Sequence, residues 1–102
     1  MFTILGFYKF KKLDKLNKKK IFFQKYFIEN YIKGTLIISK EGINGTISGK
    51  SRNISYINKK IKSLLKFSKF DSENISKSHF QPFHRPKVKI KKEVVPMGLK
   101  IL

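Results

Sequence analysis

The chain has 102 residues, with 24 Lys and Arg against six Asp and Glu, a formal net charge of +18 and no cysteine. This length fits one small domain, and the absence of cysteine excludes a disulfide framework, a zinc-thiolate site and a cysteine nucleophile within these residues. The excess of positive charge favours an anionic partner, first of all nucleic acid, with a generically basic surface as the alternative.

The apolar residues are too dispersed for a membrane segment. The longest purely apolar runs span three residues, whereas a transmembrane helix needs about 20. The start of the chain has no basic segment ahead of its apolar residues and no small-residue cleavage site, so it predicts a strand rather than a signal peptide. We therefore expect no membrane partner and a cytoplasmic location.

The first half of the chain predicts a strand, a helix and a hairpin. Residues 3–10 carry apolar side chains on both faces, as a central strand does. From Asp14, a candidate N-cap, to about residue 31, apolar residues recur at helical spacing, with lysines on the remaining face. Residues 34–39 and 43–48 then predict two strands joined by a Lys-Glu-Gly turn.

The second half predicts one helix and two strands. Residues 52–67 place apolar side chains three and four apart, with Ser51 or Asn53 as the helix cap. Residues 75–80 predict a strand, and residues 87–93 predict another in which apolar and lysine side chains alternate.

The order of these elements predicts the fold. It is β-α-β-β-α-β followed by an additional C-terminal strand, which indicates an α+β, ferredoxin-like or acylphosphatase-like sandwich. In such a sandwich two helices cover one face of an antiparallel sheet. We assign residues 1–95 to this domain and residues 96–102 to the start of a linker.

Glycines concentrate between residues 34 and 49, where Asn44-Gly45 is the strongest local turn signal. We predict a tight hairpin with a positive φ at Gly45, and consider one at Gly42 as well. The spacing of these glycines matches neither a Walker loop nor a dinucleotide-binding loop, so phosphate binding of those kinds is excluded.

A basic segment follows the last helix. Exposed Phe80 and Phe83 beside a basic strand would stack unpaired bases while ammonium groups follow the phosphates; the alternative is that both rings belong to the core. Two histidines five residues apart, without nearby carboxylates or thiols, are poor metal ligands, so no metal is expected. The candidate RNA-binding residues are His84, Arg85, Lys87, Lys89, Lys91 and Lys92.

Two motifs carry a resemblance to a known family. EGINGT at residues 41–46 and PFHRPKVKIKKEVV at residues 82–95 resemble the N-terminal domain of the rhodanese-related tRNA uridine hydroxylases. The resemblance implies a ferredoxin-like domain that precedes a rhodanese domain, with the complete protein using molecular oxygen to hydroxylate the wobble uridine of tRNA at carbon 5. It implies that the catalytic cysteine lies in the rhodanese domain, and that residues 96–102 lead toward that domain.

The resemblance implies a truncated or fragment form that is inactive alone, holds no cofactor and positions tRNA for the complete protein. The EGINGT residues would form a loop that faces the RNA or the rhodanese partner, namely Glu41, Gly42, Asn44, Gly45 and Thr46. One alternative is a structural interaction domain that holds a rhodanese partner without touching RNA. A small acylphosphatase-like enzyme is disfavoured because residues 10–14 lack the glycine and arginine of a phosphate-binding loop.

Overall fold

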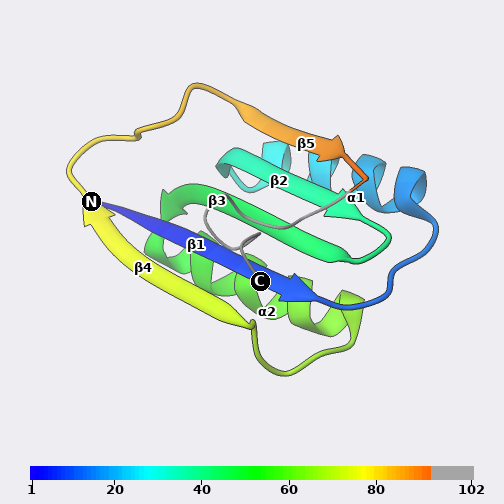
Figure 1. Cartoon of the computed structure of the whole chain (residues 1–102). Coiled ribbons are helices and arrows are strands. Elements are labelled where there is room, and N and C mark those ends of the chain that lie inside the picture. The colour runs from blue at the N-terminus through cyan, green and yellow to red at the C-terminus, as the bar shows by residue number, and fades with distance from the viewer. Residues whose placement is uncertain (93–102) are drawn as a thin grey trace.

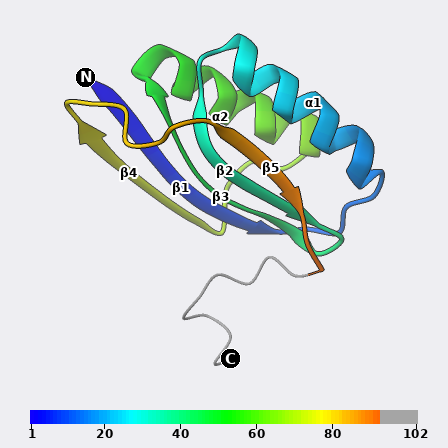
Figure 2. The same ribbon diagram turned by 90° about the horizontal axis from the view of Figure 1, so that it is seen from above.

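Seven regular elements follow one another in the computed structural model, which describes residues 1–92. Their order confirms the predicted α+β fold, and both helices lie on one face of the sheet (Figures 1 and 2). The predicted bounds fall within three residues of the observed ones over the described range. The elements are β1 (Phe2–Phe10), α1 (Leu16–Glu29), β2 (Lys33–Ser39), β3 (Gly42–Lys50), α2 (Ser51–Leu65), β4 (Ser72–Ser78) and β5 (Pro86–Ile90).

The sheet has the strand order β4-β1-β3-β2-β5. Strand β1 is paired on both sides, as predicted, although β3 occupies the middle of the sheet. The prediction of a wholly antiparallel sheet is wrong at one edge, because β5 runs parallel to β2. The cause is the connection over residues 79–85, which crosses one end of the sheet from β4 to the opposite edge and starts β5 where β2 also starts (Figure 1).

The core lies between the sheet and the two helices. Alternate residues of each inner strand point into it, as the two-residue period of a strand requires. Helix α2 contributes apolar residues at spacings of three and four, as predicted. The largest fully buried side chains are Leu5, Phe23, Phe27, Ile32, Leu36, Ile38, Ser39, Ile43, Ile47, Ile57 and Ile61.

The helix caps differ from the prediction. Asp14 is not the N-cap of α1, because the helix begins after Lys15, whose backbone is left-handed at φ 49°. Neither Ser51 nor Asn53 caps α2; the N-cap position belongs to Lys50, and the Ser51 hydroxyl instead lies 2.7 Å from the Thr3 hydroxyl. The three candidate caps were chosen from local propensity, and for Ser51 the contact of its hydroxyl with Thr3 replaces the cap.

Only part of the apolar surface of α1 is buried. Phe23 and Phe27 enter the core, whereas Ile21 is 70% exposed and Ile28 is 58% exposed. Tyr31, which follows the helix, is 78% exposed. Apolar residues occur almost all round this helix in the sequence, so its periodicity could not show which side packs on the sheet.

The glycine prediction is half correct. Gly42 has φ 145°, as considered, and Gly34 has φ 115°, but the φ of Gly45 is not positive. Asn44 and Gly45 lie inside β3 rather than in a turn, because the hairpin turns at Lys40-Glu41. The Ser39 hydroxyl accepts a hydrogen bond from the Glu41 N–H at 3.0 Å, which stabilises that turn.

We expect Asp71 to make stability depend on acid pH. Its carboxylate accepts a hydrogen bond from the Phe10 N–H at 2.6 Å and lies 3.4 Å from the Lys9 ammonium, and these contacts lower the pKa of Asp71. A lowered folded pKa contributes stability above the unfolded value of about 4, and that stability is lost as pH falls through the folded pKa.

The Asp71→Asn variant should therefore lose less stability than the parent between pH 7 and pH 3. Since the side chain is 36% exposed, solvent screening limits the difference to about 1 kcal/mol. Urea melts of both proteins at the two pH values measure it. An identical pH dependence in the two proteins would show that Asp71 contributes no such stability.

Candidate nucleic-acid interface

The core orients the lysines of β5. Val88 is buried and pairs with Leu36 of β2, so its neighbours Lys87 and Lys89 point to the opposite, helix-free face of the sheet. The strand ends at Ile90, but the Lys91 N–H still donates to the Ile38 carbonyl at 2.9 Å and continues the ladder. The predicted one-faced basic strand is thus confirmed for Lys87 and Lys89.

Helix α1 holds the outer edge of β5. The Gln24 side chain accepts a hydrogen bond from the Val88 N–H at 3.1 Å and donates one to the Pro86 carbonyl at 3.2 Å. This pair of bonds covers the backbone groups of an edge strand that would otherwise face solvent. The backbone of β5 is consequently fixed on both sides while its lysine side chains extend into solvent.

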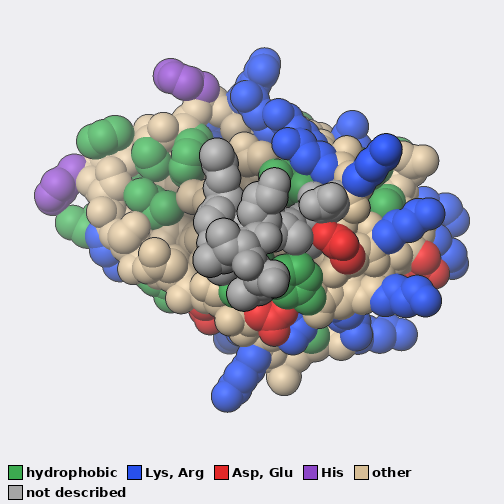
Figure 3. All heavy atoms as spheres, viewed as in Figure 1, with side chains coloured by type: hydrophobic (Ala, Val, Ile, Leu, Met, Phe, Trp, Pro, Cys, Tyr) green, Lys and Arg blue, Asp and Glu red, His purple; other side chains and the backbone are tan. Residues whose placement is uncertain are grey.

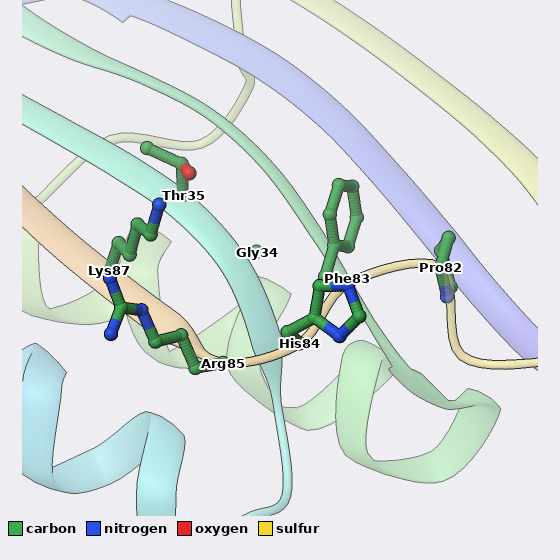
Figure 4. Close-up of a pocket in the computed structure, with 7 residues that line it drawn as sticks. All are labelled: Gly34, Thr35, Pro82, Phe83, His84, Arg85 and Lys87. Atoms are coloured by element: carbon green, nitrogen blue, oxygen red, sulfur yellow. The ribbon is translucent and has the colours of Figure 1, made fainter.

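A pocket of about 420 Å³ lies where the connection into β5 passes over the start of β2 (Figure 4). A second pocket, of about 280 Å³, adjoins it on the helix-free face and shares Thr35 and Phe83. The first is lined by Gly34, Thr35, Pro82, Phe83, His84, Arg85 and Lys87. The second is lined by Thr35, Ile37, Asn44, Gly45, Thr46 and Phe83.

These pockets bring together residues from the two sequence motifs. Asn44 and Thr46 come from the EGINGT motif, and Arg85 and Lys87 come from the basic segment about 40 residues later. Strand β2 joins them, because Thr35 pairs with Thr46 on one side and with Lys87 on the other. Neither aromatic ring of the segment belongs to the core: Phe80 is 68% exposed but lines neither pocket, and Phe83 is partly exposed and lines both.

Other predicted site residues lie elsewhere. Lys91 and Lys92 line a separate pocket of about 370 Å³ with Lys40 at the far end of β5. Glu41 is in the hairpin turn, and Gly42 pairs with Phe10 at the start of β3. The expectation of an EGINGT loop is therefore wrong: this segment is mostly central strand, because Ile43 enters the core and residues 43–46 pair with both β1 and β2.

Four residues that matter here were not predicted from the sequence. Gly34 and Thr35 form part of the pocket, and Gln24 and Gln81 hold its walls, the latter by donating to the Ser48 carbonyl at 3.3 Å. The two glutamines each follow a phenylalanine and give no local signal of their role. Only the register of β5 against β2 identifies Thr35.

Positive charge predominates at this interface. Within residues 1–92 the two ion pairs are Lys9–Asp71 and Lys19–Asp14, and neither involves a residue of the pockets. Figure 3 shows Lys and Arg side chains along the upper margin of the helix-free face, over β5. Arg85, Lys87 and Lys89 thus keep their charge uncompensated by a described carboxylate, and they are available to an anionic ligand.

The loop between β1 and α1 is built differently from an anion cradle. The Lys11 N–H donates to the Glu41 carbonyl and the Leu13 N–H donates to the Lys40 carbonyl, each at 2.9 Å. Backbone N–H groups that bind a phosphate must point at the ligand, whereas these two are engaged by the hairpin. The loop therefore lacks the glycine and arginine of an acylphosphatase-type site, and the hairpin engages two of its amides.

Residues 1–92 show neither a membrane-spanning helix nor a cluster of metal ligands. Neither helix there has the length and apolar character that crossing a bilayer requires. The same range contains no group of three or more His, Cys, Asp and Glu side chains placed to hold a metal ion.

Known sequences align with this chain along nearly its full length. The model of the family described as UPF0176 acylphosphatase-like domain matches residues 2–94. A protein from Pelagibacter ubique (strain HTCC1062) described as tRNA uridine(34) hydroxylase is 63% identical over 101 residues, covering 99% of this chain and 34% of that protein. A protein of the same description from Rhizobium leguminosarum bv. trifolii (strain WSM2304) is 33% identical, covering 96% and 31%. The chain thus spans about a third of the length of these curated relatives.

Solved structures share the fold at low sequence identity. The calcium and cyclic-diGMP complex of Klebsiella pneumoniae BlrP1 aligns with a TM-score of 0.71 and 14% identity, covering 90% of this chain and 24% of that one. Acylphosphatase from Bacillus subtilis aligns with a TM-score of 0.59 and 13% identity, covering 86% and 98%. At such identities the likeness concerns the fold alone.

Proposed function

The chain belongs to the family of UPF0176 acylphosphatase-like domains, and from this we propose that it is the N-terminal, tRNA-positioning domain of a tRNA uridine(34) hydroxylase. The identity to a protein of that description over almost the whole chain supports the assignment. The complete protein would hydroxylate the wobble uridine with molecular oxygen and would work in the cytoplasm.

The observation that carries this proposal is the basic strand β5 beside a helix-free sheet face. Lys87 and Lys89 are two residues apart on one face of the strand, a spacing of about 6.6 Å that is close to the separation of successive phosphates. Phosphate contacts fix the register and orientation of a nucleic acid without reading its sequence. A domain with this surface is therefore better suited to position a tRNA than to select among tRNA sequences.

Catalysis is assigned to the part of the protein beyond this chain. The 102 residues contain no cysteine, so a cysteine-dependent step needs a rhodanese domain. We propose that residues 1–95 form the tRNA-positioning domain and that residues 96–102 begin the linker; residues 93–102 lie outside the described residues.

Binding of tRNA to the chain is the direct test. If about five of the candidate basic residues neutralise phosphates, log K should fall with log salt with a slope of about −3.5 to −4.5, depending on the share of single-stranded contacts. Fluorescence anisotropy of labelled tRNA over a salt series measures this slope. Absence of binding at low salt would contradict the proposal.

The exposed side of α1 favours a second role, contact with a rhodanese partner domain. Ile21 and Ile28 line a pocket of about 490 Å³ together with Gln24 and flanking charged residues. Apolar side chains seven apart on an exposed helix form one stripe, and that stripe lies in the helix layer, whereas Lys87 and Lys89 of β5 point to the opposite face of the sheet. The two roles therefore do not compete for one surface.

A further inference from the structure

We propose that Phe83 and the strands beneath it form a pocket for one unstacked base of a single-stranded RNA segment, an inference that rests on the proposed function. The base would lie against the Phe83 ring, its polar edge would face β2 and β3, and the adjoining phosphate would lie toward Arg85 and Lys87. The base would thus be bound by Phe83 and by the side chains of β2 and β3. The basic strand β5 would supply only positive charge for the phosphate.

Phe83 is suited to be a stacking platform. Its ring borders both pockets on this face, and within residues 1–92 no other Phe or Tyr ring and no Lys ammonium packs against it. Figure 4 shows the ring standing apart from Arg85 and Lys87, with Gly34 and Thr35 between them. Stacking on an aromatic ring is open to every base, because every base has a π-face.

The loop that carries Phe83 is held at three points. The Phe80 N–H donates to the Ser78 hydroxyl at 3.2 Å, Gln81 donates to the Ser48 carbonyl at 3.3 Å, and the Gly34 N–H donates to the Arg85 carbonyl at 3.1 Å. These bonds bracket Phe83 on both sides. A ring whose backbone is fixed in this way loses less conformational entropy when a base stacks on it.

The floor of the smaller pocket offers hydrogen-bonding groups to a base edge. Thr35 pairs with Thr46 across the strands, and Asn44 lies two residues before Thr46 on β3, so the two hydroxyls and the amide are on one face of the sheet. Within the described residues none of these three side chains has a hydrogen-bond partner of its own. An amide supplies both donors and acceptors and a hydroxyl supplies either, which matches the mixed edge of a base.

The geometry favours a single strand over a duplex. The pocket of about 280 Å³ is hollowed between the loop and the sheet, so a base must leave its helical stack to enter it. Proteins that recognise RNA bases do so mainly on unstacked bases of loops and single strands. Arg85 and Lys87, at the rim of the adjoining pocket, lie where the backbone of such a strand would pass.

Phe83→Leu tests the proposal, with Phe80→Leu as the matched control. Phe80 is in the same loop and is more exposed, but it lines neither pocket. The probes are a mixed-sequence RNA heptamer and the same heptamer annealed to its complement, titrated by fluorescence anisotropy. Phe83→Leu should weaken binding of the single strand about fivefold to 150-fold, the range for one stacked base. Its effect on the duplex should be less than twofold.

Phe83→Tyr should retain the affinity of the parent, because the ring is kept, and Phe80→Leu should change it less than twofold. Unchanged single-strand binding by Phe83→Leu, or an equal loss in the two leucine variants, would overturn the base pocket. That failure is distinct from failure of the proposed function: a normal salt slope for tRNA would leave the basic strand in place and remove only the pocket.

Discussion

Replacing Gly42 by alanine will lower the free energy of unfolding by about 3 kcal/mol or more, one of the largest losses expected of a single methyl group. An added Cβ at Gly42 would lie 2.0 Å from the Lys9 carbonyl oxygen, and the φ of 145° is open only to glycine. Gly34→Ala should be comparably harmful, because its Cβ would lie 2.2 Å from the Thr46 carbonyl oxygen. Both obstacles are backbone atoms of a neighbouring strand, so they cannot move without opening the sheet.

Alanine variants of two further glycines, Gly45 and Gly6, provide the comparison for this loss of stability. Gly45→Ala should cost about 1 to 3 kcal/mol through overpacking, because its Cβ would lie 2.8 Å from the Phe7 ring and 2.9 Å from the Thr35 carbonyl. Gly6→Ala is the control: its nearest neighbours are at 3.9 Å, so stability should rise slightly or stay within about 1 kcal/mol of the parent. Urea melts of the four variants give the order, and a Gly42→Ala protein as stable as Gly6→Ala would contradict it.

The triple change of Lys87, Lys89 and Lys91 to glutamine will reduce the magnitude of the salt slope of tRNA binding by about two to three. Each lysine that leaves a phosphate removes about 0.7 to 0.9 from the slope. The fold should be retained, because all three side chains are exposed and their neighbour Val88 still anchors the strand. The measurement is anisotropy over a salt series, with circular dichroism melts to verify folding.

Local patterns in the sequence were sufficient to predict the helices and strands and their order along the chain. Ile54, Ile57 and Ile61 identify α2 and its buried side at once, because the polar residues between them leave one apolar face. Val88 between two lysines identifies the one-faced strand for the same reason. Where apolar and polar residues fall on separate faces, the spacing of the apolar residues predicts both the type of element and the side that is buried.

Features that depend on distant contacts could not be predicted in this way. The parallel pairing of β5 with β2 follows from a connection across the end of the sheet, and the burial of Phe23 and Phe27 rather than Ile21 is decided by packing on the sheet. Asn44-Gly45 has the strongest turn signal in the chain, yet the register of the hairpin places it in the central strand.

In the candidate site, too, local sequence predicts some residues and distant contacts decide the others. Its charged residues Arg85, Lys87 and Lys89 were predicted because they stand close together in the sequence. Thr35 and Gln24 join them only through strand pairing and packing. The aromatic residues were predicted as a group, but only the path of the loop distinguishes Phe83, at the pockets, from Phe80.

The salt dependence of tRNA binding, compared between two triple variants, tests the central claim that β5 faces RNA. The control changes Lys18, Lys20 and Lys25 of α1 to glutamine, which removes the same charge from exposed positions in the helix layer; Lys19 is kept because it contacts Asp14. We expect the β5 variant to lose about two to three from the magnitude of the slope and the α1 variant less than about one. Equal losses in the two variants would mean that tRNA responds only to net charge, and would contradict a specific RNA-facing strand.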